Sequence, residues 1–382
     1  MDFSLTEEQE RLRDGIIRFA RRELNAGAAE RDQKQIFPRD LWQKCAEIGL
    51  VGLPIPEAYG GSGLDPLSTI LALEVFGYGC HDGGLVFSVG AHLLACAVPI
   101  WKFGTEEQKA RYLPPLCSGQ FIAVNSMSEP QSGSDAFAMH TRAEPYGEGF
   151  CLNGTKTFST NGPVADLSLV FTVTDPKKGY FGGTTAFLVE KGTPGFSATH
   201  KIEKMGLRSS PMSELVLENV CVPSTAVLGG VGGGAAVFAH AMDWERIGIF
   251  ASNLGVIERL LEKAIEYARV RTQFGQAIGK FQAVSHRIVD IKVRLEAARW
   301  LVYRAAWQLD KAKPVSMDAS IAKLMVSESL VFAALNTVQI LRGYGYTTEY
   351  EVERVLRDAI GSTIYSGTSD IQRNIIARWL GL

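Results

Sequence analysis

The sequence lacks the features that assign chains to several common classes of protein. Its 39 lysines and arginines stand against 41 acidic residues, a net charge of −2, so the basic excess expected of a nucleic-acid-binding protein is missing. It contains no exact G-x-G-x-x-G, no P-loop and no G-x-S-x-G. These absences argue against the simplest Rossmann, nucleotide-hydrolase and serine-hydrolase interpretations.

Cysteine is scarce and scattered. No C-x-x-C pair occurs, and no zinc-like spacing links the cysteines with the six histidines, so we expect no metal site and interpret the cysteines as reduced thiols, mostly in the core. The acidic N-terminus lacks the cationic and apolar regions of a signal peptide, and we expect no apolar run of ~18 residues. The sequence therefore predicts a cytoplasmic protein without a membrane-spanning segment. The six cysteines are Cys45, Cys80, Cys96, Cys117, Cys151 and Cys221.

Length and composition predict a globular protein of more than one domain. At ~150 residues per domain, 382 residues suggest two or three. Hydrophobic residues make up 46% of the chain and charged residues 21%, which is typical of an enzyme with an ample core.

Hydrophobic periodicity divides the chain into three blocks, expected as domains 1–120, 121–235 and 236–382. The first opens with Thr6-x-x-Gln9, which matches a helix capping box. The second has short strand-like runs between glycine and proline turns, at 167–173, 185–189 and 214–218. The third follows a glycine cluster at 229–234, interpreted as a flexible linker, and has helical periodicity at 247–268, 284–302, 319–341 and 371–380. This order predicts an α+β protein with an N-terminal helical domain, a central β domain and a C-terminal four-helix bundle.

A serine- and glycine-rich turn in the middle block is the strongest candidate for a binding site. Residues 126–135 read S-M-S-E-P-Q-S-G-S-D, and N-G-T-K at 153–156 and S-T-N-G at 159–162 follow. Small residues let the backbone approach an anionic planar ligand, and exposed N–H groups form an anion-binding concavity. Taken alone, the segment is equally compatible with an ordinary turn.

Together with three further motifs, this turn makes nearly the whole chain resemble the acyl-CoA dehydrogenase family. The further motifs are A-R-V-R-T-Q-F-G at 268–275, Q-I-L-R-G-Y-G-Y at 339–346 and M-G-L-R-S-S-P at 205–211. The resemblance implies noncovalently bound FAD, with Arg271 and Phe274 meeting the cofactor of a neighbouring subunit in a homotetramer or dimer. Arginine suits a pyrophosphate because its planar fork pairs two oxygens at once. The implied FAD-binding residues are Met127, Ser128, Gly133, Ser134, Phe158, Thr160, Arg271, Phe274, Gln339, Gly343 and Thr368.

The chain departs from the family pattern at two of these places. Arg342 stands where family members have the first glycine of a G-G pair, so the contact of that segment with the adenosine half of FAD is open. Many members place a tryptophan against the flavin where this chain has Phe158. A phenylalanine ring can still stack there, but it lacks the indole donor.

The chemistry implied by the resemblance is α,β-dehydrogenation of an acyl thioester, which needs a carboxylate base. The usual Y-E-G-T-S element reads Tyr365-Ser-Gly-Thr-Ser here, and serine cannot replace the glutamate. A subset of the family carries its base on the first bundle helix in an x-E-R element, which matches Trp244-Glu-Arg. We therefore expect Glu245 to be the base. Ser366 should supply a backbone N–H to the oxyanion and leave space for a branched or cyclic acyl group, and Arg246 and Tyr365 should lie beside the substrate. A glutamate that merely favours the helix macrodipole is the alternative.

The resemblance extends most closely to family members from secondary metabolism that act on carrier-protein thioesters. It implies conversion of a prolyl to a pyrrolyl thioester, with electron-transfer flavoprotein or oxygen as electron acceptor. A short- or branched-chain acyl-CoA substrate is the runner-up. A flavin monooxygenase and a non-catalytic member of the fold are the alternatives from other classes. No nucleic-acid or membrane partner is expected.

Overall fold

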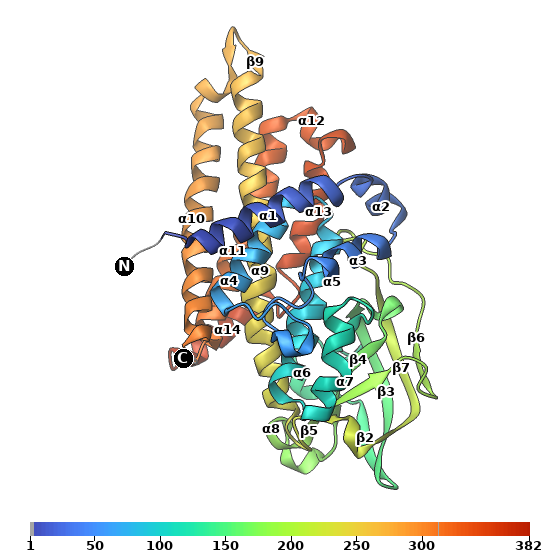
Figure 1. Ribbon diagram of the computed structural model, residues 1–382. Helices are drawn as coiled ribbons and strands as arrows, with labels where there is room; N and C mark the ends of the chain where they lie inside the picture. Colours follow the sequence, from blue (N-terminus) through green and yellow to red (C-terminus); the bar gives the residue numbers. More distant parts are fainter. Residues whose placement is uncertain (1–3, 312) are drawn as a thin grey trace.

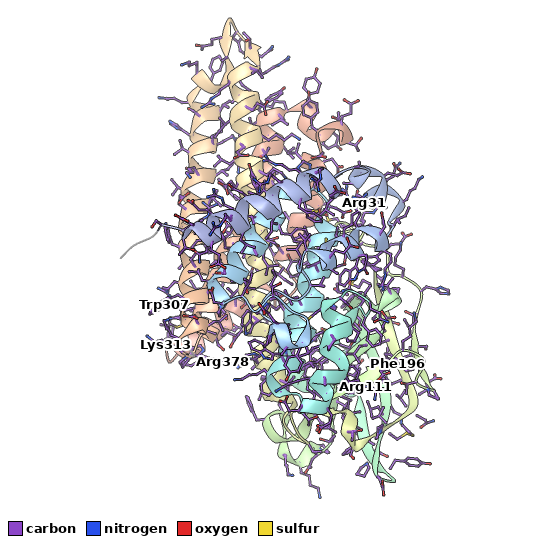
Figure 2. The ribbon with its side chains drawn as sticks, in the orientation of Figure 1. Arg31, Arg111, Phe196, Trp307, Lys313 and Arg378 are labelled. Atoms are coloured by element: carbon purple, nitrogen blue, oxygen red, sulfur yellow. A yellow bond between two sulfur atoms is a disulfide. The ribbon has the colours of Figure 1, made fainter. Side chains whose placement is uncertain are left out.

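The computed structural model describes residues 4–311 and 313–382. The expected capping box is confirmed, since the Thr6 hydroxyl accepts from the Gln9 N–H at 3.2 Å and the Gln9 side chain accepts from the Thr6 N–H at 3.1 Å. Arg31, labelled in Figure 2, ties the N-terminal helices together through an ion pair of 2.6 Å with Asp82. The N-terminal helices are α1 (Glu7–Glu23), α2 (Ala28–Lys34), α3 (Arg39–Glu47), α4 (Pro66–Gly79), α5 (Gly83–His92), a π-helical turn (Leu93–Ala97), α6 (Val98–Phe103) and α7 (Glu106–Cys117).

The middle of the chain forms an eight-stranded sheet, in which all three expected strand segments are confirmed. Its strand order is β6-β7-β3-β2-β4-β5-β8, with β1 pairing parallel to β4. The sheet lies at the lower right in Figure 1. The strands are β1 (Ala123–Ser126), β2 (Arg142–Tyr146), β3 (Gly149–Thr160), β4 (Leu167–Val173), β5 (Thr184–Glu190), β6 (Phe196–Ala198), β7 (Met212–Pro223) and β8 (Val227–Leu228), with the short helix α8 (Tyr180–Gly183) before β5.

The last third of the chain is a helical bundle, as expected. Its three long helices α9, α10 and α11 pack along one another, and α13 and α14 pack against α11 (Figure 1). The hairpin of β9 (Thr272–Gln273) and β10 (Gln276–Ala277) projects from one end. The helices are α9 (Gly234–Val270), α10 (Gln282–Asp310), α11 (Ser316–Leu341), α12 (Gly343–Tyr346), α13 (Val352–Ser362) and α14 (Ser369–Trp379).

The glycine cluster at 229–234 is a hydrogen-bonded turn rather than a free linker. Gly229, Gly230 and Gly232 have φ between 73° and 84°, a conformation that favours glycine. The Gly232 N–H donates to the Thr185 hydroxyl at 2.9 Å. The turn therefore fixes the start of α9 against β5.

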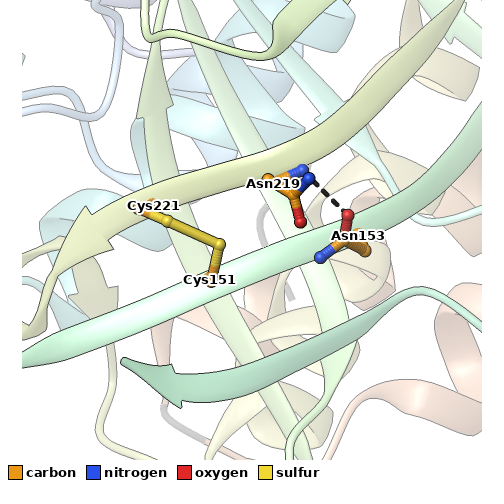
Figure 3. The surroundings of a disulfide bond; sticks show 4 residues. All are labelled: Cys151, Asn153, Asn219 and Cys221. Carbon is orange, nitrogen blue, oxygen red and sulfur yellow. Dashed lines mark hydrogen bonds between the residues drawn. A yellow bond between two sulfur atoms is a disulfide. The ribbon is translucent and has the colours of Figure 1, made fainter. Parts of the chain in front are cut away.

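The expectation that all six cysteines are reduced thiols is wrong for two of them. Cys151 on β3 and Cys221 on β7 are bonded as a disulfide (Figure 3), with their Cα atoms 4.1 Å apart. They face each other directly in the antiparallel register of the two strands. Because 70 residues separate them, cysteine spacing gave no signal of the pairing. The other four cysteines are free and buried.

The expectation that no apolar run reaches membrane-spanning length is also wrong. Two helical segments of the described chain are long and apolar enough, Gly83–Phe103 and Ser316–Leu341. The most apolar window of each is 83% and 56% buried inside the protein, respectively. The first segment is mostly buried and the second packs along α9 and α10 within the bundle, so their length and composition are weak evidence for a membrane span.

The helix that carries the expected base crosses α4 at two glycines. A Cβ atom on Gly77 would lie 2.0 Å from the Ser252 carbonyl oxygen, and one on Gly255 would lie 2.0 Å from the Glu74 carbonyl oxygen. The backbones of α4 and α9 therefore approach too closely for any side chain at these positions. This crossing fixes the lateral position of α9 against the N-terminal helices.

We predict that Gly77→Ala destabilises the protein by at least about 1–3 kcal/mol, because the added methyl group forces two packed backbones apart. Gly15→Ala is the matched control, since it lies within α1 and a Cβ there meets no atom within 4 Å. That variant should gain about 0.5–1 kcal/mol from helix propensity. Thermal unfolding of both variants checks the prediction, and equal melting temperatures would contradict it.

Candidate active site

Glu245 and Ser366 meet where α9 passes the loop between α13 and α14. The Ser366 hydroxyl donates a hydrogen bond to Glu245 Oε1. The Ser366 carbonyl in turn accepts from Arg246 Nε at 3.1 Å and from the Gln372 side-chain amide at 3.1 Å. Ser366 has φ +57°, a left-handed conformation that only surrounding contacts can hold in a residue with a side chain. The structure thus brings together three of the four expected catalytic and substrate-side residues in one contact.

Burial dominates the electrostatics of this contact. Burial raises the pKa of Glu245, while the Ser366 hydroxyl and the Arg246 charge act in the opposite direction. A carboxylate with a raised pKa is a stronger base than one in water, and the Ser366 hydrogen bond favours its charged form. Glu245 therefore has the environment of a general base rather than of a solvated helix-end acid.

Tyr365 forms an aromatic wall next to Ser366. Its ring centroid lies 4.6 Å from that of Phe87 and 5.5 Å from that of Phe250, and its hydroxyl accepts from the Asn253 side-chain amide at 3.3 Å. Burial raises the pKa of Tyr365 well above its ordinary value. The phenol is therefore neutral, and the wall beside the base is apolar with a single polar end.

Lys323 is a buried cation that the sequence analysis missed. It lies on α11 with its side chain fully buried, and its Nζ has no hydrogen-bond partner among the described residues. The nitrogen lies 5.2 Å from the centroid of the Phe250 ring. Burial and the nearby Arg246 charge lower the pKa of Lys323 to about 8. The only sequence signal was a lysine within an otherwise apolar helical run.

The expected flavin-binding turn is held by a buried ion pair. Lys156 Nζ lies 2.8 Å from Glu129 Oε1 and donates to the Met127 carbonyl at 3.1 Å. Glu129 also accepts the backbone N–H groups of His140 and Thr141 at 2.6 and 2.9 Å. Although burial disfavours both charges, these donors and the Lys156 charge keep the pKa of Glu129 below its usual value. Both residues lie in motifs that the sequence singles out, but 27 positions separate them and nothing in the sequence indicates that they pair.

The turn lies against β3, which carries two more of the expected residues. The Ser128 carbonyl accepts from the Thr157 N–H at 2.8 Å, and the β3–β7 register shifts between Lys156 and Ser159. At this irregularity Phe158 has φ +53° and is 63% exposed. An aromatic ring held outward in a strained conformation is typical of a surface that stacks on a ligand. Ser128 therefore lies beside the end of β3 that carries Phe158 and Thr160, and Met127, Gly133 and Ser134 belong to the same turn as Ser128.

A separate hollow of about 830 Å³ lies at the far end of the bundle. Arg271, Phe274 and Gly343 line it, and the Phe274 ring is 94% exposed. The Arg271 guanidinium lies 6.0 Å from the Tyr344 ring centroid and has no carboxylate partner among the described ion pairs. An unpaired guanidinium over a largely apolar hollow has the chemistry to hold a phosphate beside a planar group.

Two expected residues lie away from this hollow. Gln339 is exposed on the last turn of α11, next to the lining residue Ile340 but not itself part of the lining. Thr368 caps α14, where its hydroxyl accepts from the Ile371 N–H at 3.2 Å. It stands two residues after Ser366 and so belongs with the Glu245 contact.

One chain does not bring the two halves of the expected cofactor site together. Arg271 directly follows α9, about 39 Å along its axis from Glu245 at a rise of ~1.5 Å per residue. Figure 1 shows the β9 hairpin at one end of the molecule and the sheet with β3 at the other. A single cofactor of ordinary size cannot touch both groups in the same chain.

Family models define the class of protein to which this fold belongs. Family models for the N-terminal, middle and C-terminal domains of acyl-CoA dehydrogenase match residues 6–120, 125–220 and 232–381. The chain belongs to the acyl-CoA dehydrogenase family. The expected fold and family are thereby confirmed.

Relatives in this family include proteins that act on carrier-protein and on coenzyme A thioesters. An L-prolyl-[peptidyl-carrier protein] dehydrogenase from Pseudomonas fluorescens is 42% identical over the full length of both chains. A short-chain-specific acyl-CoA dehydrogenase from Clostridium acetobutylicum is 40% identical over 99% of each chain.

Two solved structures also match this chain over nearly its whole length. The prolyl acyl carrier protein oxidase AnaB matches with a TM-score of 0.98 and 47% identity over 99% of this chain and 100% of that one. A structure of PigA with FAD and proline matches with a TM-score of 0.98 and 41% identity over the full length of both.

Proposed function

We propose that the protein is an FAD-dependent dehydrogenase that oxidises a carrier-protein-bound prolyl thioester to a pyrrolyl thioester. The observation that carries the proposal is the contact of Glu245 with Ser366, which puts a carboxylate on the first bundle helix and a small residue in the loop opposite. Full-length likeness to a prolyl-carrier-protein dehydrogenase, and to PigA, whose structure holds FAD and proline, supports it.

The residues of the cofactor surface fit a flavin nucleotide. Phe158 offers an exposed ring beside the turn at 127–134, and a Cβ on Gly133 would meet no atom within 4 Å, so a ligand can approach that backbone. FAD, when bound, accepts the hydride that leaves the substrate. Met127, Ser128, Ser134, Thr160 and Thr368 are the further residues of this chain that we assign to it.

The neighbouring subunit completes the cofactor site in this proposal. Arg271, Phe274, Gln339 and Gly343 lie too far from Phe158 to share its cofactor, so they hold the nucleotide half of a cofactor bound mainly by another copy. This requires a homo-oligomer, of which a tetramer or dimer is the family form. We also propose domain boundaries at 1–120, 121–235 and 236–382.

Glu245 removes the α-proton of the prolyl thioester while the β-hydrogen leaves as hydride. Its raised pKa strengthens the carboxylate as an acceptor for a weakly acidic proton. The Ser366 N–H stabilises the enolate-like oxygen that develops at the thioester, and the hydroxyl orients Glu245. Tyr365 packs against the ring, and Arg246 fixes the backbone of the loop. Once the first electron pair has passed to the electron acceptor, a second two-electron oxidation would remove a further proton and hydride from other positions of the ring and give the aromatic pyrrole.

A short- or branched-chain acyl-CoA thioester is the second candidate substrate. Its support is the 40% full-length identity to an acyl-CoA dehydrogenase. Both substrates need the same base, and they differ in the acyl group and in the handle that carries it. Electrons leave to an electron-transfer flavoprotein or to oxygen, and we place the enzyme in the cytoplasm.

We predict that Glu245→Gln retains FAD but lowers turnover by at least the ~100-fold typical of a lost general base. Ser366→Ala should have a milder effect, since it removes a hydrogen bond and leaves the carboxylate in place. The flavin spectrum reports cofactor content, and single-turnover flavin reduction reports the chemical step. Near-normal reduction in the Gln variant would show that another group is the base.

We predict that a carrier-protein-bound prolyl thioester reduces the flavin faster than any straight-chain acyl-CoA. The small Ser366 frees volume on one wall of the site, and a ring branched at the α-carbon needs that volume. The measurement is stopped-flow flavin reduction with prolyl, isovaleryl and butyryl thioesters, each attached to coenzyme A and to a carrier protein. A preference for a free coenzyme A ester would favour the second candidate.

A further inference from the structure

The surface beside the start of α9 carries a cluster of exposed aromatic side chains. Phe137 packs on Tyr180 and Phe181 with ring centroids 4.1 and 6.0 Å apart, and the Tyr180 and Phe181 centroids are 5.3 Å apart. Phe137 is nevertheless 52% exposed and Phe181 81% exposed. Ordered aromatic rings that form a cluster yet face solvent are the composition expected at the centre of a protein–protein interface.

Two exposed lysines flank this cluster. Lys177 and Lys178 precede α8; Lys178 lies 3.4 Å from Asp175, and Lys177 forms no ion pair among the described residues. The patch therefore combines an apolar centre with a positive edge. We call the five residues Phe137, Lys177, Lys178, Tyr180 and Phe181 the aromatic–lysine patch.

The patch lies between the flavin-binding turn and the helix that carries the base. Phe137 follows the turn at 127–135 directly, and α8 packs against the glycine turn before α9, where a Cβ on Gly232 would lie 2.6 Å from the Gly182 carbonyl oxygen. Figure 1 shows α8 beside the N-terminal end of α9. From Gly234 to Glu245 the helix rises about 17 Å at ~1.5 Å per residue. That distance suits a thioester delivered on an extended phosphopantetheine arm.

We propose that the aromatic–lysine patch is the docking surface for the acidic, helical carrier-protein domain that bears the prolyl thioester. The inference rests on the proposed function and names the partner surface for that site. The aromatic centre contacts apolar residues around the modified serine of the carrier domain. The lysines attract its acidic helix, which steers encounter and orients the arm toward Glu245. A coenzyme A nucleotide would satisfy the lysines but would leave two of the three aromatic rings without a partner.

The test compares substrates with and without the protein handle. The variants are Phe137→Ala/Phe181→Ala and Lys177→Glu/Lys178→Glu, and the control is Lys34→Glu/Ile36→Ser, which changes an exposed lysine and an exposed apolar residue at the end of α2. The substrates are L-prolyl thioesters of a peptidyl-carrier-protein domain, of coenzyme A and of pantetheine. We expect kcat/KM for the carrier-protein substrate to fall about 10- to 100-fold, through KM, as for loss of interface hot-spot residues. Turnover of prolyl-pantetheine should not change in either patch variant. The control variant should keep the wild-type kcat/KM for the carrier-protein substrate.

A direct binding measurement separates this proposal from the proposed function. Fluorescence anisotropy of a labelled holo-carrier-protein domain reports docking without turnover, and we expect the lysine variant to lose both affinity and the salt dependence of binding. If the wild type oxidises no prolyl thioester, the proposed function fails, while anisotropy still decides whether the patch docks the domain. Unchanged carrier-protein affinity in both variants overturns the docking proposal. Equal losses of kcat/KM with coenzyme A and carrier-protein thioesters also overturn it, because the patch would then bind a nucleotide. A change in native oligomeric mass in the variants overturns it as well, because the patch would then bind a second copy of this chain.

Discussion

The hydrogen bond from Ser366 to Glu245 is the contact on which the organisation of the site depends. It joins α9 to the α13–α14 loop, two segments more than 100 residues apart in sequence. Arg246 and Gln372 hold the carbonyl of the same serine, so the base, its orienting hydroxyl and the loop form one unit. The glycine crossing of α4 with α9 then fixes this unit laterally against the N-terminal helices. A base held in this way needs no reorganisation when substrate excludes water.

Buried charge is used differently in the two parts of the site. At the flavin-binding turn Glu129 and Lys156 are both nearly inaccessible, and five hydrogen bonds, one of them between the two side chains, compensate their desolvation. A pair of this kind adds little net stability, but removing one partner is costly because it leaves a lone buried charge. The pair therefore specifies one conformation of the turn. Lys323 has no such partner in the part of the chain that the structure describes, and burial together with the Arg246 charge lowers its pKa.

Sequence reasoning recovered the features that local pattern encodes. The strands at β4, β5 and β7 and the helices of the bundle follow from periodicity, and the capping box at Thr6 follows from two side chains three residues apart. The resemblance to family members with a base on the first bundle helix, together with Ser366 where the usual glutamate would stand, pointed to Glu245.

Contacts between distant segments could not be read from the sequence. The Cys151–Cys221 disulfide depends on the register of β3 with β7, and the Glu129–Lys156 pair depends on how the turn folds back on β3. Lys323 lies beside Phe250 only because α11 packs along α9. Each of these features is set by tertiary packing rather than by local composition.

The central claim, that Ser366 tunes and orients Glu245 as the base, is tested most directly by the pH dependence of flavin reduction in the wild type and Ser366→Ala. The base acts when it is deprotonated, so the rate falls as pH drops through the pKa of Glu245. The Ser366 hydroxyl stabilises the carboxylate and lowers that pKa, so its removal should raise it. The account predicts that the acidic limb of the single-turnover profile moves to higher pH in Ser366→Ala. An acidic limb that stays in place or moves to lower pH would contradict it.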